Sequence, residues 1–249
     1  MSKRWRIGAV SYLNTRPFLL GIEQSGLMDQ IELVKDYPAK IAKALMEDTI
    51  DIGLVPVAVI PLLNDPHYIS EYCIGAEGEV ASVAIFSEVP MEQIEKIYLD
   101  HQSRTSVQLA RLMVALYWEK EVEWIQADES YIEHIGGTTA GVIIGDRALV
   151  AQQKFSYVYD LAKAWKNYTG LPFVFATWIS NKPIPEDFRQ LFDQANAYGL
   201  SHIDDVIAMI DDKEKVYDLK KYYTQNISYE FTEAKKQGLA LFLKLLSTP

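Results

Sequence analysis

The run Ser103-Arg104-Thr105-Ser106 has the residue types of a small-anion site. It places three hydroxyls and one guanidinium at the start of residues 105–118, whose apolar period predicts a helix. Hydroxyls and backbone N–H groups at a helix N-terminus, next to an arginine, can bind a carboxylate or a phosphate. The alternative is ordinary helix capping by Ser103 or Thr105, and the spacing alone does not separate the two.

Other chemically capable residues follow the ends of predicted strands or stand in an extended run. They are Ser11, Asn14, Arg16, Pro56, Ser82, Gly145 and Asp146. Ligands of open parallel sheets bind beyond the carboxyl ends of the strands, so we expect these residues to line one cleft. Taken singly, Asn14 is more typical of a turn, and Asp146 can equally cap the helix that it begins.

Short apolar runs alternate with amphipathic segments along the chain, and this alternation predicts an α/β fold. Strands are predicted at residues 6–12, 31–37, 51–55, 97–99, 122–125 and 141–144, and helices at 39–48, 105–118 and 146–153. Residues 186–246 have a helical period throughout. The first three strands and the helices between them predict a mostly parallel sheet.

Two extended apolar runs, residues 80–86 and 173–179, join two such α/β sets. They predict two lobes connected by two hinge crossovers. Residues 1–87 together with 173–249 would form the first lobe, and residues 88–172 would form an inserted second lobe.

The composition narrows the class of protein. The chain has 249 residues, 49% of them hydrophobic, and a formal net charge of −10, which disfavours nucleic acid and anionic membranes as partners. The apolar run after the basic N-terminus is too short for a signal peptide, so we predict a cytoplasmic protein.

The lone Cys73 is expected to be a buried apolar residue. No nucleotide-binding or metal-binding motif is visible, and a monomer and a dimer both remain open.

The same strand-end segments carry a family resemblance. Residues 7–17, 72–76 with 82–87, 99–107, 142–149 and 160–178 resemble, in order, the motifs of the chorismate dehydratases of menaquinone biosynthesis. The resemblance implies a type II periplasmic-binding-protein fold, no cofactor, and conversion of chorismate to 3-[(1-carboxyvinyl)oxy]benzoate and water in the futalosine route. It also implies that Asn14, Ser82 and the run 103–106 contact the substrate.

A mechanism consistent with the residues and the resemblance has two parts. Ser82 and the run 103–106 would hold the substrate carboxylates, while Asn14 would polarise a substrate oxygen near the reacting carbons. The base would be Asp146 or a carboxylate of the substrate itself.

Two other functions fit the same fold. One is a non-catalytic solute-binding protein for small anions. The other is the sister lyase that acts on cyclic dehypoxanthine futalosine, whose first loop typically reads Ser-Pro-Cys-x-Asp-Thr. Residues 11–17 here read Ser-Tyr-Leu-Asn-Thr-Arg-Pro, which favours the dehydratase.

Overall fold

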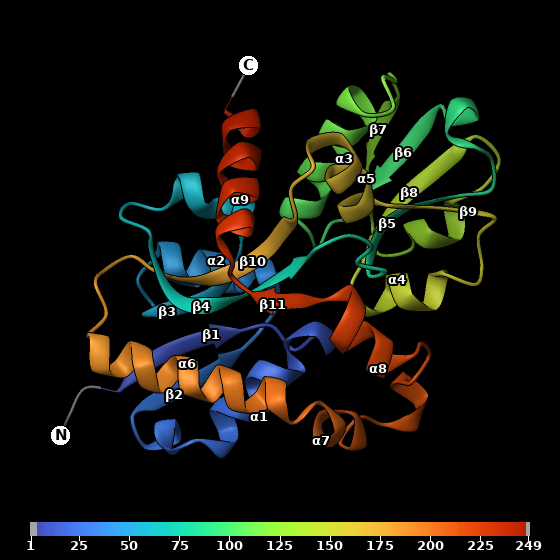
Figure 1. Ribbon diagram of the computed structural model, residues 1–249. Helices are drawn as coiled ribbons and strands as arrows, with labels where there is room; N and C mark the ends of the chain where they lie inside the picture. The colour runs from blue at the N-terminus through green and yellow to red at the C-terminus, as the bar shows by residue number, and fades with distance from the viewer. Residues whose placement is uncertain (1–3, 248–249) are drawn as a thin grey trace.

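The chain forms two α/β units, each built around one β-sheet (Figure 1). The computed structural model describes residues 4–247. The first sheet has the strand order β11-β4-β10-β3-β1-β2. Its strands are β1 (Trp5–Ala9), β2 (Ile31–Lys35), β3 (Ile52–Pro56), β4 (His67–Ala76), β10 (Phe173–Ser180) and β11 (Ser228–Glu230). The second sheet, in the order β7-β6-β8-β5-β9, contains β5 (Val83–Ser87), β6 (Lys96–Leu99), β7 (Glu123–Gln126), β8 (Thr139–Ile144) and β9 (Tyr157–Asp160).

Both sheets are mixed. In the first sheet, β1 pairs in parallel with β2 and β3, as the β-α-β-α-β pattern predicts. However, β10 is antiparallel to both β3 and β4, and β11 is antiparallel to β4. The expectation of a mostly parallel sheet is therefore wrong for this half of the sheet. The parallel part still brings the carboxyl ends of β1 and β3 to the same edge.

The helices cover the outer faces of both sheets. The first unit carries α1 (Arg16–Gln24), α2 (Pro38–Met46), α6 (Glu186–Ser201), α7 (Ile203–Ala208), α8 (Leu219–Lys221) and α9 (Glu233–Leu246). The second unit carries α3 (Thr105–Leu116), α4 (Asp146–Ala151) and α5 (Leu161–Thr169). Capping groups in the sequence explain several helix ends: Asp160 accepts a hydrogen bond from the Lys163 N–H at the start of α5, and Gly170 ends that helix at a φ of 74°.

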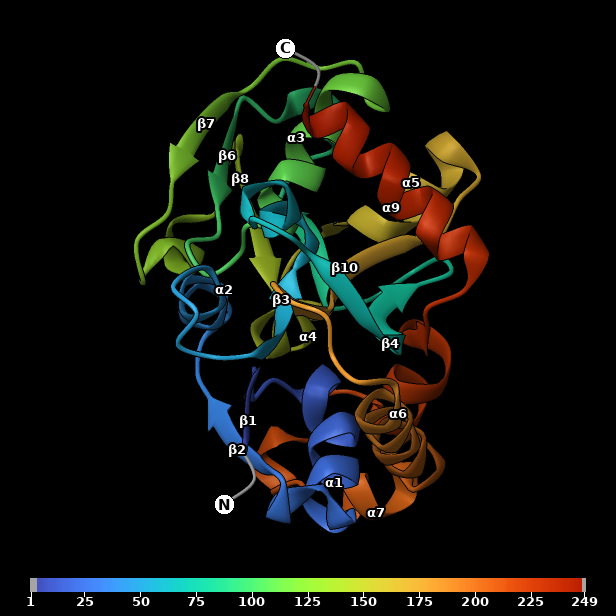
Figure 2. The ribbon, with the colours of Figure 1, turned by 90° about the vertical axis from the view of Figure 1, so that its left-hand side faces the viewer.

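Helices α1 and α6 lie side by side (Figures 1 and 2) and approach each other backbone to backbone. A Cβ on Gly21 would lie 1.8 Å from the carbonyl oxygen of Ala195, and a Cβ on Gly199 would lie 1.8 Å from that of Pro17. Both positions therefore require glycine, and the pair fixes α1 firmly against α6.

The chain crosses between the units after β4 and again after α5. The first crossover is tied to the second unit, because the Asp160 carboxylate accepts hydrogen bonds from the Val80 and Ala81 N–H groups at 2.9 and 2.8 Å. Strand β5, which the sequence analysis placed in the first lobe, pairs with β8 and β9 of the second sheet. We therefore propose that the second lobe begins at residue 83 rather than at residue 88.

The C-terminal region departs from the all-helical prediction for residues 186–246. A π-helix occupies Tyr222–Asn226, and β11 then extends the first sheet alongside β4. Beyond β11, α9 runs past α5 of the second unit, where the rings of Phe242 and Trp165 are 6.0 Å apart (Figure 2). Helical periodicity alone could not signal this interruption, because the strand is defined by its pairing with distant residues.

One expectation about a single residue can be compared with the structure. Cys73 is completely buried in β4, as its usual behaviour predicts, and burial raises the pKa of its thiol to about 12. Among residues 4–247, no group of three or more His, Cys, Asp and Glu side chains is arranged to hold a metal ion. Within the same range, no helix has the length and apolar character that a bilayer crossing requires.

Candidate functional site

A pocket lies between the two units, at the carboxyl ends of β1, β3 and β8. It encloses about 660 Å³ of space, part of it open to solvent. Seven of the predicted site residues line it: Asn14, Pro56, Ser82, Ser103, Thr105, Ser106 and Gly145.

The N-terminus of α3 supplies three hydroxyls to the pocket wall. The Ser103 Oγ accepts a hydrogen bond from the Ser106 N–H at 3.0 Å, so Ser103 does cap the helix. The Thr105 Oγ1 accepts one from the Ala58 N–H of the first unit at 3.2 Å. Ser106 is almost completely buried, and its Oγ has no hydrogen-bond partner among the described residues. Its hydroxyl is therefore available to a ligand.

Arg104 faces away from this pocket and lines a separate hollow with Val107 and Gln108 of α3. Ser103 lines both hollows, whereas Thr105 and Ser106 line only the pocket between the units. The run 103–106 is therefore divided, and its guanidinium does not join the hydroxyls in the pocket.

The first loop is held by hydrogen bonds to its backbone. The Leu13 carbonyl accepts a hydrogen bond from the Tyr223 hydroxyl at 2.9 Å, and the Asn14 carbonyl accepts one from the Tyr229 hydroxyl at 3.0 Å. The Thr15 hydroxyl donates to the Asn14 Oδ1 at 3.1 Å. These contacts leave the Nδ2 of Asn14 without a partner among the described residues, so it can donate to a ligand.

Ser82 stands in the crossover between β4 and β5 and is almost fully buried. Its Oγ accepts a hydrogen bond from the Tyr222 hydroxyl at 2.9 Å, and its carbonyl accepts one from the Gly145 N–H at 2.8 Å. Gly145 has a φ of 64°, and a Cβ at this position would meet the Tyr12 ring at 3.8 Å. Burial raises the pKa of the Tyr222 phenol well above its usual range, so this hydroxyl stays protonated as a donor.

Three other predicted residues do not line this pocket. Ser11 is exposed. Arg16 lines a different hollow, where it lies 3.7 Å from the carboxylate of Glu214. Asp146 is the first residue of α4, and its Oδ1 accepts a hydrogen bond from the Leu13 N–H at 3.2 Å. Burial, together with the charge of Glu214, raises the pKa of the Asp146 carboxyl to about 6 despite this bond.

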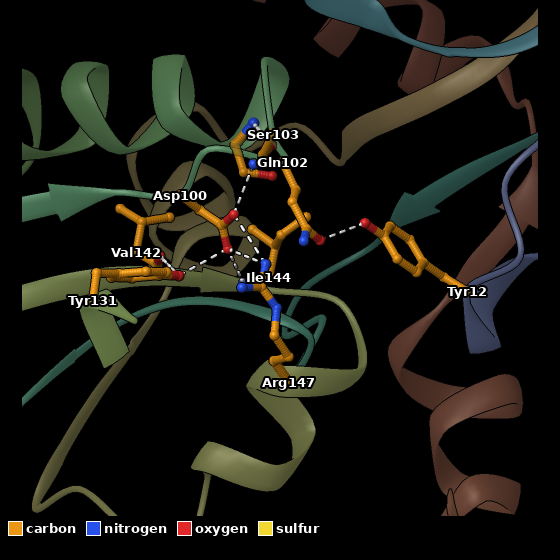
Figure 3. Close-up of polar contacts among 9 residues, drawn as sticks. Tyr12, Asp100, Gln102, Ser103, Tyr131, Val142, Ile144 and Arg147 are labelled. Carbon is orange, nitrogen blue, oxygen red and sulfur yellow. Dashed lines mark hydrogen bonds and ion pairs between the residues drawn. The ribbon is translucent and has the colours of Figure 1, made fainter. Parts of the chain in front are cut away.

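A buried carboxylate supports the loop that precedes α3 (Figure 3). The Asp100 side chain accepts hydrogen bonds from the Tyr131 hydroxyl at 2.8 Å, the Gln102 N–H at 2.9 Å and the Ile144 N–H at 3.3 Å. It also pairs with Arg147 at 2.8 Å. Asp100 thereby ties the end of β6 to β8 and α4 and fixes the loop that carries Gln102.

Sequence reasoning missed Tyr12, Gln102 and Tyr222. The Tyr12 hydroxyl donates to the Gln102 Oε1 at 2.9 Å, which links the two units across the pocket (Figure 3). Burial raises the pKa of Tyr12 to about 12, so it remains a donor at neutral pH. Both residues stand in strand-end loops, so the strand-end rule could have found them. Tyr222 lies in the π-helix, which was not predicted, and no local sequence pattern indicates that this tyrosine contacts Ser82.

Comparison with known families identifies the chain. Residues 5–248 match the family described as menaquinone biosynthesis. The protein belongs to this family. A chorismate dehydratase of Thermus thermophilus is 24% identical over 267 residues, which cover 94% of this chain and 97% of that protein.

Solved structures similar to this menaquinone-biosynthesis protein confirm the predicted periplasmic-binding-protein-like fold. The aliphatic sulphonate binding protein SsuA of Escherichia coli has a TM-score of 0.63 at 15% identity, with 100% of this chain and 94% of that chain covered. Protein AF1704 of Archaeoglobus fulgidus has a TM-score of 0.68 at 12% identity, with 97% and 96% covered. At these identities, the likeness concerns the fold alone.

The pocket of this menaquinone-biosynthesis protein is electrically neutral. None of the described residues that line it carries a carboxylate, ammonium, guanidinium or imidazole group. Its polar groups are hydroxyls, side-chain amides and the N-terminus of the twelve-residue helix α3. A helix N-terminus carries a partial positive charge of about half an elementary charge. The site can therefore hold an anion by dipoles and hydrogen bonds, without a salt bridge.

Proposed function

We propose that the protein is a cytoplasmic chorismate dehydratase, which converts chorismate to 3-[(1-carboxyvinyl)oxy]benzoate and water in menaquinone biosynthesis via futalosine. The observation that carries this proposal is that Asn14, Ser82 and Ser106 line the same pocket, whose described lining residues have no charged side chain. All three stand in the segments that resemble the dehydratase motifs. The similarity to the Thermus thermophilus chorismate dehydratase along nearly the whole chain supports the same reading.

Chorismate carries two carboxylates, and the pocket offers two groups of neutral donors. We assign Ser106 and the N-terminus of α3 to one carboxylate, because the Ser106 hydroxyl has no protein partner among the described residues. Ser82 receives its own hydrogen bond from Tyr222, and its hydroxyl hydrogen can therefore donate to the substrate. Asn14 polarises a substrate oxygen close to the reacting carbons. Arg16, Arg104 and Ser11 are left out of the proposed site.

The reaction removes one proton and one hydroxyl from adjacent ring carbons. The electrons of the broken C–H bond pass into an enolate of the ring carboxylate and then form the new ring double bond as the C–O bond breaks. The base passes the proton that it removed to the departing hydroxide, which leaves as water. The ring carbon that loses the proton is joined through a ring double bond to the ring carboxylate. Hydrogen-bond donors on that carboxylate therefore stabilise the extended enolate.

The described residues that line the pocket include no base for this proton. No carboxylate or imidazole stands among the described lining residues, and the Asp146 oxygen nearest the first loop already binds the Leu13 N–H. We therefore assign proton removal to a carboxylate of the substrate, and we give Asp146 no part in the chemistry. The protein then contributes orientation, exclusion of water and stabilisation of the enolate.

The decisive experiment incubates the purified protein with chorismate and follows the product by liquid chromatography and mass spectrometry. The proposal predicts a product lighter than chorismate by one water and with the absorbance of a benzoate. Chorismate binding measured by calorimetry, without turnover, would instead identify a solute-binding protein. Turnover of cyclic dehypoxanthine futalosine, but not of chorismate, would identify the sister lyase.

A further inference from the structure

The backbone of Leu13 and Asn14 is bound from both units of the protein. On the side of the first unit, the hydroxyls of Tyr223 and Tyr229 donate to the carbonyls of Leu13 and Asn14. On the side of the second unit, the Asp146 Oδ1 accepts from the Leu13 N–H at 3.2 Å. The Leu13 side chain is itself almost fully buried, so this segment has little freedom once the three bonds are made.

Of these three contacts, only the one to Asp146 depends on the second unit. Tyr223 and Tyr229 follow α8 in the same part of the chain as β11, which belongs to the first sheet. Asp146 begins α4, directly after β8 of the second sheet. If the two units move apart, the Leu13 N–H loses its acceptor while the two tyrosines stay in place.

We propose that Asp146 is a positioning residue, which couples the approach of the two units to the placement of Asn14 in the pocket. This inference rests on the proposed function, because it takes Asn14 to be a substrate-contacting group. A carboxylate that accepts a backbone N–H makes a charge-assisted hydrogen bond, which is stronger and more directional than one to a neutral acceptor. Arg16, Arg147, Glu214 and the phenols of Tyr12 and Tyr223 surround this carboxylate.

The first test compares Asp146→Ala with Asp146→Asn. The alanine variant loses the acceptor, and we expect kcat to fall about 10- to 100-fold with a smaller change in KM, because a misplaced catalytic group costs rate of this order. The asparagine variant keeps an acceptor oxygen of the same reach, and we expect kcat to return close to wild type. If Asp146 were the base, both variants would be equally inactive, and that result would overturn the proposal.

The matched control is Asp128→Ala, which removes an exposed aspartate of the second unit whose hydrogen bonds are to Ser130 and to the Tyr131 backbone beside it. We expect wild-type kcat from this variant. Melting temperatures of all three variants show whether a loss of rate follows from unfolding. A correctly folded Asp146→Ala with wild-type kcat would contradict the positioning role.

A second readout does not need turnover. Hydrogen–deuterium exchange of peptides that cover residues 10–16 reports on the Leu13 amide in the substrate-free protein. We expect faster exchange in Asp146→Ala than in wild type, and slower exchange again in Asp146→Asn. If the wild type does not convert chorismate, the proposed function fails, and this measurement still decides whether Asp146 holds the loop. Equal exchange in all three proteins would refute the positioning role.

Discussion

Asp100 offers a direct test of how the pocket is supported. We consider Asp100→Ala, which removes the carboxylate that joins the end of β6 to β8 and α4. The side chain is fully buried and accepts hydrogen bonds from four different groups. Its loss should destabilise the fold and also loosen the loop that carries Gln102.

The size of the effect follows from which donors can find another partner. The single hydrogen of the Tyr131 hydroxyl can turn to the Val142 carbonyl, which lies 2.8 Å away. The Arg147 side chain is 32% exposed and can turn to water. The Ile144 N–H is buried in β8, and the Gln102 N–H lies on a half-buried loop residue; both lose their acceptor. An unsatisfied buried donor costs about 1–3 kcal/mol, so the two together should lower the free energy of unfolding by about 2–6 kcal/mol.

Urea unfolding followed by circular dichroism measures this change. Tyr131→Phe is the matched control, since it removes only one of the hydrogen bonds to Asp100 and should cost about 1 kcal/mol. A loss below about 1 kcal/mol in Asp100→Ala would mean that water replaces the carboxylate without penalty. The buried network would then not be what fixes the loop.

Three further predictions concern single residues. Ser106→Ala should raise KM for chorismate about 10-fold, whereas Arg104→Ala, outside the pocket, should leave it nearly unchanged. Asn14→Ala should lower kcat about 100-fold in a steady-state assay. Burial raises the pKa of Asp146 from 3.8 to about 6, so the folded protein holds this proton more tightly. The free energy of unfolding should therefore fall by about 1–2 kcal/mol between pH 4 and pH 6, and Asp146→Asn should flatten that slope in urea titrations.

The first half of the fold follows closely from sequence patterns. The predicted strands at 6–12, 31–37 and 51–55 correspond to β1, β2 and β3, because each is a short buried run between turn or helix signals. Strand β4 was missed, although it runs from His67 to Ala76. It contains exposed positions and Gly75, so its hydrophobic pattern is weak, and it is held in place by β10 and β11 from the far end of the chain.

The candidate site was predictable where it lies on one strand end and unpredictable where it is assembled over long distances. Asn14 was identified because it follows a strand, Ser106 because it begins a helix, and Ser82 because it stands in an extended crossover run. Arg104 was included as part of the run 103–106, but it lines a different hollow from Ser106. The tyrosines of the C-terminal region reach the first loop across more than two hundred residues, and no local signal encodes such contacts.

The contact between α1 and α6 sets a requirement that the pocket itself does not reveal. Helix α1 begins at Arg16, directly after the loop that carries Asn14, and Gly21 and Gly199 hold it against α6 without intervening side chains. A single methyl group at residue 199 would push α1 aside and carry Asn14 with it. Relatives that share every pocket residue but have a larger residue at position 21 or 199 should therefore be poor enzymes. Transferring the pocket residues to another scaffold should fail unless both glycines are transferred with them.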